Sequence, residues 1–172
     1  MIEHRLIERM IPCLKKEKTR LEEKRCIDCS FLNQTVDFFR MYADKCHHGK
    51  EEDILFKALV DKEISPEHKK VIASLMEDHK YGRSLIKKLD SIKDNDANDI
   101  SESVEAVLKI LDELLCLYPR HIQTEDDELF IPAMDYFDEE EQQRMRDEFF
   151  DFDRTMIHTK YKQMIVSLED ER

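Results

Sequence analysis

The sequence predicts an all-α protein, and composition, hydrophobic spacing and helix start signals all support this prediction. The 172 residues are 41% hydrophobic and 40% charged, with only two Gly and four Pro. That balance is typical of long amphipathic helices. Runs in which Val, Ile and Thr alternate with polar residues, as they do in strands, are absent from the sequence. We therefore expect an antiparallel four-helix bundle with an additional C-terminal helix.

The first two predicted helices are long. The first runs from about Ile2 into the low twenties and contains Pro12, which is expected to kink it. The second runs from about Asp28 to Asp61. Apolar residues recur at three- and four-residue spacing in both, so each helix presents one face to a core.

The third predicted helix starts at Ser65-Pro66, because Ser is a favoured N-cap and Pro is favoured at the first helical position. It continues to about Ile92. The polar stretch over residues 93–99 then predicts a loop.

The fourth and fifth helices each begin with a capping-box spacing, an Asp followed three residues later by a Glu. Asp99 and Glu102 open the fourth helix, in which Pro119 is expected to introduce a bend. Asp138 and Glu141 open the fifth. We expect a single domain over residues 1–172, with the bundle over about 2–137 and the C-terminal helix over about 139–168.

Charge and composition exclude several classes of partner. The formal net charge is −12 and no basic patch is present, which argues against nucleic acid. No apolar run is long enough to cross a bilayer, and the first residues lack the apolar core of a signal peptide. We therefore expect no membrane association and a cytoplasmic location. Five cysteines, an odd number, suit reduced thiols better than a disulfide framework.

A ten-residue pattern occurs twice in the chain. Residues 47–56 and 121–130 share the pattern His-x-x-x-Glu-acid-Asp-x-Leu-Phe without a gap. A His and a Glu four residues apart lie on the same face of a helix. Here that face continues into Leu and Phe, which favours burial over the alternative of ordinary surface pairs. Burying two glutamates without a cation is costly, so the repeat points to a pair of metal ions inside the bundle.

Two further histidines lie on apolar faces, His79 on the third helix and His4 on the first. A single core-facing histidine is more often a hydrogen-bonded core residue than a ligand, but here two other helices also direct histidines inward. Imidazole and carboxylate donors without thiolate suit iron, manganese or zinc, and the residues alone do not choose among these metals. The candidate inward set is His4, His47, Glu51, His79, His121 and Glu125.

Four segments occur in an order and spacing typical of a known family. They are residues 3–8, residues 47–56, residues 77–79 followed by Gly82-Arg83, and residues 121–130 with Pro132. With these segments the chain resembles the hemerythrin-like proteins of the HHE cation-binding type over nearly its whole length. The resemblance implies a four-helix bundle around two carboxylate-bridged non-haem iron ions. By position, it implies terminal ligands at His4, His47, His79 and His121, and bridging carboxylates at Glu51 and Glu125.

The third helix departs from the family pattern. Hemerythrins typically have a second histidine one turn before the third-helix ligand, and here that position is Leu75. His48 is the main candidate to replace it, since some relatives use the residue directly after the second-helix histidine. A solvent-facing His48 is the other interpretation, and Glu22 or Glu23 are weaker substitutes.

The fourth-helix carboxylate also departs from the family pattern. The family typically places it five residues after the histidine, which would select Asp126. The internal repeat instead pairs Glu125 with Glu51, so we favour Glu125.

The pair Cys26-x-x-Cys29 has three interpretations. It could be a redox pair or half of a zinc site, but the sequence contains no second such pair. Two structural thiols are therefore favoured. Cys46 directly precedes His47, which leaves open a location beside the metal site.

Three hypotheses for function follow. The first is a di-iron protein that binds or senses a small diatomic ligand, O2 or NO, or that handles iron. The second is a di-iron enzyme that reduces peroxide or NO or repairs iron–sulfur clusters. The third is an interaction bundle with a structural metal. The sequence identifies neither the small ligand nor a redox partner, and it leaves a homodimer open.

Overall fold

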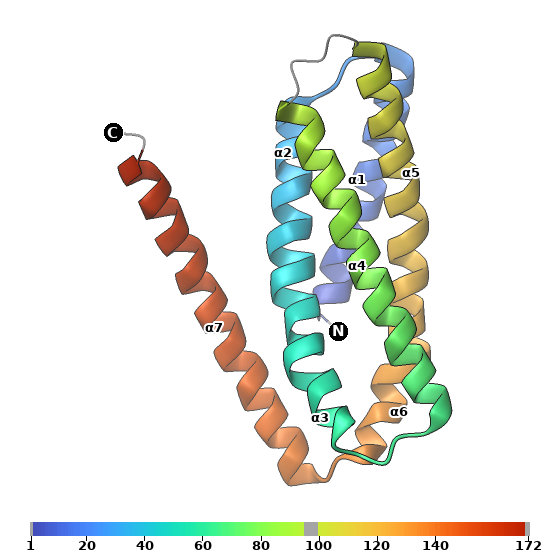
Figure 1. Ribbon diagram of the computed structural model, residues 1–172, viewed down its shortest axis with the longest axis vertical. Helices are drawn as coiled ribbons and strands as arrows, with labels where there is room; N and C mark the ends of the chain where they lie inside the picture. Colours follow the sequence, from blue (N-terminus) through green and yellow to red (C-terminus); the bar gives the residue numbers. More distant parts are fainter. Residues whose placement is uncertain (1, 95–99, 171–172) are drawn as a thin grey trace.

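Five helices make up the described part of the chain, which contains no strand. The computed structural model describes residues 2–94 and 100–170, with side chains described for 3–92 and 101–156. Four of the helices stand side by side as a bundle and the fifth lies outside it (Figure 1). The predicted all-α fold is therefore confirmed.

The bundle helices are continuous, although several change their hydrogen-bonding pattern along their length. α5 lies between α1 and α4, and α4 lies beside α2. The first helix is α1 (Ile2–Lys24), and the third is α4 (Pro66–Asp94). The second helix consists of α2 (Cys29–Asp37), the π-helical segments η1 (Phe38–His48) and η2 (Glu51–Phe56), and α3 (Lys57–Val60). The fourth consists of α5 (Ile100–Thr124), π-helical η3 (Glu125–Phe130), α6 (Ile131–Ala133) and the 3-10 turn η4 (Met134–Tyr136). The fifth helix is α7 (Glu139–Asp170).

The helix starts use the caps that the sequence predicts. Ser65 Oγ accepts a hydrogen bond from the backbone N–H of His68 at 3.1 Å. Asp138 and Glu141 form a reciprocal capping box, with N–H to carboxylate distances of 3.0 and 2.8 Å. The capping pair expected at Asp99 lies outside the described residues, as does most of the predicted loop. α4 itself continues to Asp94, slightly past its predicted end.

The two prolines inside helices do not end them. α1 continues through Pro12 and α5 continues through Pro119. Proline removes one backbone hydrogen bond, and the packing of an amphipathic face provides most of a helix's stability in a protein. Both helices have such a face.

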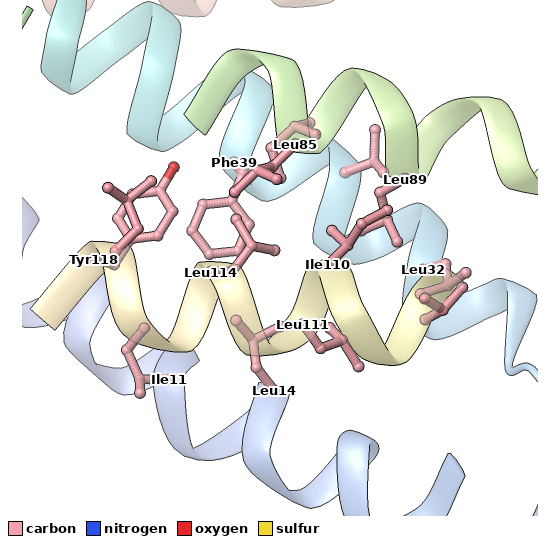
Figure 2. Close-up of a cluster of buried hydrophobic side chains, with 14 of the residues drawn as sticks. Ile11, Leu14, Leu32, Phe39, Leu85, Leu89, Ile110, Leu111, Leu114 and Tyr118 are labelled. Carbon is pink, nitrogen blue, oxygen red and sulfur yellow. The ribbon is translucent and has the colours of Figure 1, made fainter. Parts of the chain in front are cut away.

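A large apolar cluster fills one end of the bundle. Side chains from all four bundle helices meet in it, including Leu14, Phe39, Leu85 and Leu114, none of which has measurable exposure. Figure 2 shows these rings and branched chains interlocking between α5 and its neighbours. We call this set the upper cluster.

A smaller apolar cluster, which we call the lower cluster, lies at the other end. It contains Leu55, Leu75 and Leu129 from the bundle and Met145 from α7. Three bundle helices contribute side chains to both clusters. On each of them, a buried His or Glu lies between the residues of the upper cluster and those of the lower cluster. A layer of buried polar side chains therefore separates the two clusters.

α7 contacts the bundle through its first half, and its second half extends away from it (Figure 1). A Cβ atom added to Gly49 would lie 2.8 Å from the Phe152 ring, so glycine is what permits this close approach. Among the described residues, no helix is both long and apolar enough to cross a membrane.

Candidate metal centre

The buried polar layer consists of the residues that the sequence singled out. Each has a relative exposure of 3% or less. All four bundle helices contribute: His4 from α1, His47 and His48 from η1, Glu51 from η2, His79 from α4, His121 from α5 and Glu125 from η3.

These side chains form two groups, each able to hold a metal ion. The first group is His4, His47, Glu51 and Glu125, and the second is His48, Glu51, His79 and His121. Within each group one ligand atom from every residue lies within 4.8 Å of the others. Glu51 belongs to both groups, so the two sites are adjacent.

The Glu51 carboxylate divides its oxygens between the groups. Oε1 lies 3.5 Å from His47 Nε2, in the first group. Oε2 lies 3.4 Å from His79 Nε2, in the second. A carboxylate with one oxygen toward each site has the orientation needed to bridge two ions.

Glu125 is arranged in the same way. Its Oε2 lies 3.1 Å from His4 Nε2, and its Oε1 lies 3.0 Å from His121 Nε2. Glu125 was counted above in the first group only. Its Oε1 nevertheless lies beside the second group, because it is close to His121. We therefore treat both carboxylates as shared.

The arrangement of donors fits bound cations. An ion with bonds of about 2.1 Å separates its donors by about 3.0 Å at right angles and by about 4.2 Å when opposite, and the distances above lie in or near that range. Several of these atoms have no hydrogen-bond partner among the described residues: both oxygens of Glu51 and of Glu125, both nitrogens of His48 and His121, and His79 Nε2. Buried polar atoms rarely stay unpaired, and a metal ion would satisfy them together.

Without a cation, the electrostatics of this layer are unfavourable. Burial and the nearby charge of Glu125 raise the pKa of Glu51 well above its usual range. Burial alone would lower the pKa of His79, but the neighbouring carboxylates of Glu125 and Glu51 outweigh it and raise this pKa to about 10. The protein alone can balance the two buried carboxylates only by taking up protons, whereas a cation balances them directly.

His47 and His48 favour the neutral form that a metal requires. Burial lowers the pKa of His47 well below its usual range, and burial lowers that of His48 to about 4. A neutral imidazole keeps a lone pair for a metal ion.

Acidic side chains outside the layer orient two of the histidines. His4 Nδ1 lies 2.9 Å from Asp126 Oδ1, and His79 Nδ1 lies 2.6 Å from Glu52 Oε1. Each acid follows a shared carboxylate in the ten-residue repeat and acts on a histidine from another helix. Such contacts fix the ring and leave Nε2 directed inward. The sequence analysis did not predict this role for Glu52 and Asp126, although their shared position in the repeat was a signal for it.

Two more carboxylates lie behind histidines of the second group. Asp44 lies 3.6 Å from His48 Nδ1, and Asp78 lies 3.6 Å from His121 Nδ1, slightly beyond hydrogen-bonding distance. Arg83 bonds both Asp44 and Glu52, at 2.7 and 2.5 Å. Asp44 and Asp78 have no counterpart in the repeat. Asp44 lies four residues before His48, a spacing that could have revealed it, whereas only the packing of the helices reveals Asp78.

The structure decides the position of His48. Its ring stacks on that of His79 with centroids 3.9 Å apart, and the side chain is 3% exposed, so the solvent-facing interpretation is wrong. Leu75 is an apolar member of the lower cluster. Glu22 and Glu23 are exposed, and Glu22 pairs with Lys18 instead. Neither belongs to the layer.

π-helical turns present the second- and fourth-helix donors. His47 and His48 end η1, Glu51 begins η2, and Glu125 begins η3. In an α-helix adjacent side chains are about 100° apart. A π-helical turn bonds each N–H to the carbonyl five residues back and so contains more residues, which brings adjacent side chains closer in direction. This explains how both His47 and His48 face the interior.

The cysteines lie outside the two groups. All five are free thiols, and Cys26 and Cys29 are exposed. Cys46 donates a hydrogen bond to Asp153 at 3.2 Å, and burial raises its pKa to about 12. His68, without a predicted role in the site, bonds the Tyr136 hydroxyl at 2.8 Å.

Fold and site together define a four-helix bundle with a polar centre able to hold cations. Residues 1–133 match the family model described as hemerythrin HHE cation binding domain. The chain therefore belongs to this family, which is a family of cation-binding domains. Comparison with curated proteins found no match, and neither did comparison with solved structures.

Proposed function

We propose that the chain holds two iron ions bridged by Glu51 and Glu125. His4 and His47 would be terminal ligands of one ion, and His48, His79 and His121 of the other. The observation that carries the proposal is the division of each carboxylate's two oxygens between the groups. Iron follows from the family and from a donor set of imidazole and carboxylate without thiolate.

The function we propose is binding or sensing of a small diatomic ligand, O2 or NO, or handling of iron. The second group offers three imidazoles and two carboxylate oxygens, whereas the first offers only two imidazoles and two oxygens. The first ion would therefore have more open coordination positions and is the expected place for a small ligand. When bound, iron supplies those positions and its redox chemistry. The chain's own residues orient the histidines and exclude bulk water.

The second candidate is an enzyme that reduces peroxide or NO or repairs iron–sulfur clusters. A cavity of 420 Å³ beside His48 and another of 550 Å³ beside Glu51 favour it, because both lead toward the centre. The cytoplasmic location, the absence of a nucleic-acid partner and the choice between monomer and homodimer stay predictions.

Metal analysis and anaerobic mixing test the proposal. Protein from iron-replete cells is expected to contain two irons per chain. Reduced protein mixed with O2 should give a stable new absorption spectrum if it binds the ligand, and rapid oxidation with peroxide consumption if it is an enzyme. Well under one iron per chain would contradict both functions. Bound iron with no response to O2, NO or peroxide would favour a structural metal.

A further inference from the structure

A cavity of 550 Å³ lies between α7 and the bundle. Its size falls within the range of about 300–1,000 Å³ that is usual for small-molecule sites. The walls are mainly apolar and come from η2, the end of the fourth helix and α7: Leu55, Phe130, Met134, Met145, Phe149 and Phe150.

The cavity reaches the first group. Glu51 lines it although this side chain is only 1% exposed, so Glu51 marks its inner end. The Phe130 ring, which forms part of the wall, stacks on the His4 ring with centroids 5.4 Å apart. The cavity therefore approaches the centre on the side with fewer histidines.

Three charged side chains of the cavity, Lys50, Glu3 and Asp153, neutralise one another, whereas Arg146, which also lines it, is exposed and bonds Gln143. Lys50 Nζ bonds Glu3 at 2.5 Å and Asp153 at 2.8 Å, and Lys50 itself is buried. Its ammonium is already matched by these carboxylates, so it offers little to an incoming anion. For the same reason the two carboxylates offer little to an incoming cation.

Contacts beside the metal layer hold α7 over the cavity. Asp153 bonds both Lys50 and Cys46, and Phe152 lies against Gly49. Cys46, Gly49 and Lys50 lie within a few positions of His48 and Glu51 in the sequence. α7 itself lies beyond residues 1–133, which match the family, so the outer wall comes from outside the matched residues.

We propose that this cavity binds a neutral, mainly apolar organic molecule larger than a diatomic gas. The molecule lies under α7 with its polar end toward Glu51. Apolar walls favour such a molecule through burial, and the matched charges disfavour an ion. The position of its polar end beside a metal ion rests on the proposed function; the binding itself does not.

Straight-chain alcohols from 1-butanol to 1-octanol test the proposal on metal-loaded, full-length protein carrying ¹³C-methyl methionine. The methyl signals of Met134 and Met145 should shift on titration, while that of Met10, beside the upper cluster, should not. Affinity should rise by about fourfold for each added methylene. Octanoate and octylammonium should bind at least about tenfold more weakly than 1-octanol.

A matched pair of variants locates the binding. Phe150→Asp places a charge on the cavity wall at a side chain that is 64% exposed, so folding should tolerate it. It should weaken 1-octanol binding at least about tenfold. Ile131→Asp makes the same change at a side chain that is 76% exposed and outside the cavity, and it should leave binding unchanged.

The outcomes separate the two proposals. Normal iron content with no selective shift at Met134 and Met145 overturns this inference and leaves the metal centre standing. Equal binding of octanoate overturns the ligand class. Shifts that depend on protein concentration without alcohol overturn the small-molecule occupant, because a second copy of the chain would then fill the cavity. Selective shifts in protein that takes up no iron would support the cavity, and the missing iron, not the shifts, would count against the proposed function.

Discussion

The first and second groups share both carboxylates but differ in their histidines and in the support behind them. In the second group, Nδ1 of His79 lies 2.6 Å from Glu52, and Nδ1 of His48 and of His121 each lie 3.6 Å from a carboxylate, beyond hydrogen-bonding distance. In the first, Nδ1 of His4 lies 2.9 Å from Asp126, and His47 Nδ1 has no hydrogen-bond partner among the described residues. The second group therefore has one more imidazole and more carboxylates behind its histidines than the first.

Under the proposed function, this difference suggests a division of roles between the two ions. An ion with a complete, well-supported ligand set is held firmly, and an ion with open positions meets the small ligand. The cavity of 550 Å³ reaches the first group, which agrees with that division. Variants that affect one group at a time can test it.

Glu51→Gln should have the largest effect, because it affects both groups. The substitution removes a bridging charge while nearly preserving volume, so we expect iron content to fall below about a tenth of the normal value. Without metal, the variant should be at least as stable as the parent, since one buried carboxylate has been removed. Metal analysis, with thermal unfolding in the presence and absence of chelator, measures both quantities.

Asp53→Asn is the matched control for that variant. Asp53 is exposed two residues further along the same helix, so the substitution should change neither iron content nor stability. Normal iron in Glu51→Gln would contradict the bridging role.

His47→Ala and His48→Ala compare the groups through adjacent residues. His47→Ala leaves His4 as the only imidazole of the first group, so we expect loss of about half of the iron. His48→Ala leaves His79 and His121 in place, and most of the iron should remain. Anaerobic titration with Fe²⁺ counts the sites in each variant. Equal losses would show that the groups do not differ as proposed.

The sequence predicted the helices and the inward-facing donors, because both depend on local spacing. Periodicity located the apolar faces, and the repeat located Glu51 and Glu125. Asp78 could not be found in this way, since its partner His121 lies on another helix, whereas Asp44, four residues before His48, could have been found from spacing. The π-helical turns were not predicted either, because α-helical spacing already places a His and a Glu four residues apart on one face. The sequence shows that Leu75 replaces the family's second third-helix histidine, but it leaves the position of His48 open. Only the packing of two helices brings His48 against His79.

Glu52→Gln and Asp126→Asn should have smaller, group-specific effects. Each weakens the support of one histidine, His79 in the second group or His4 in the first, and such losses typically reduce metal affinity by about 10- to 100-fold. Competition with a chelator of known affinity measures the change. The exposed neighbour Asp127→Asn should behave as the parent protein does. If Asp126→Asn weakened the more tightly bound ion, the assignment of support to the first group would be wrong.

Ser65→Ala should have the smallest effect and should not distinguish the groups. Ser65 caps α4 through the N–H of His68, far along the helix from His79, and loss of such a cap typically costs about 1 kcal/mol. We expect the free energy of unfolding in chelator to fall by about that amount, with iron content unchanged. Ser65→Thr keeps a capping hydroxyl and should recover most of the loss. A selective loss of one ion in Ser65→Ala would mean that the stability of α4 as a whole, rather than its local donors, maintains the second group.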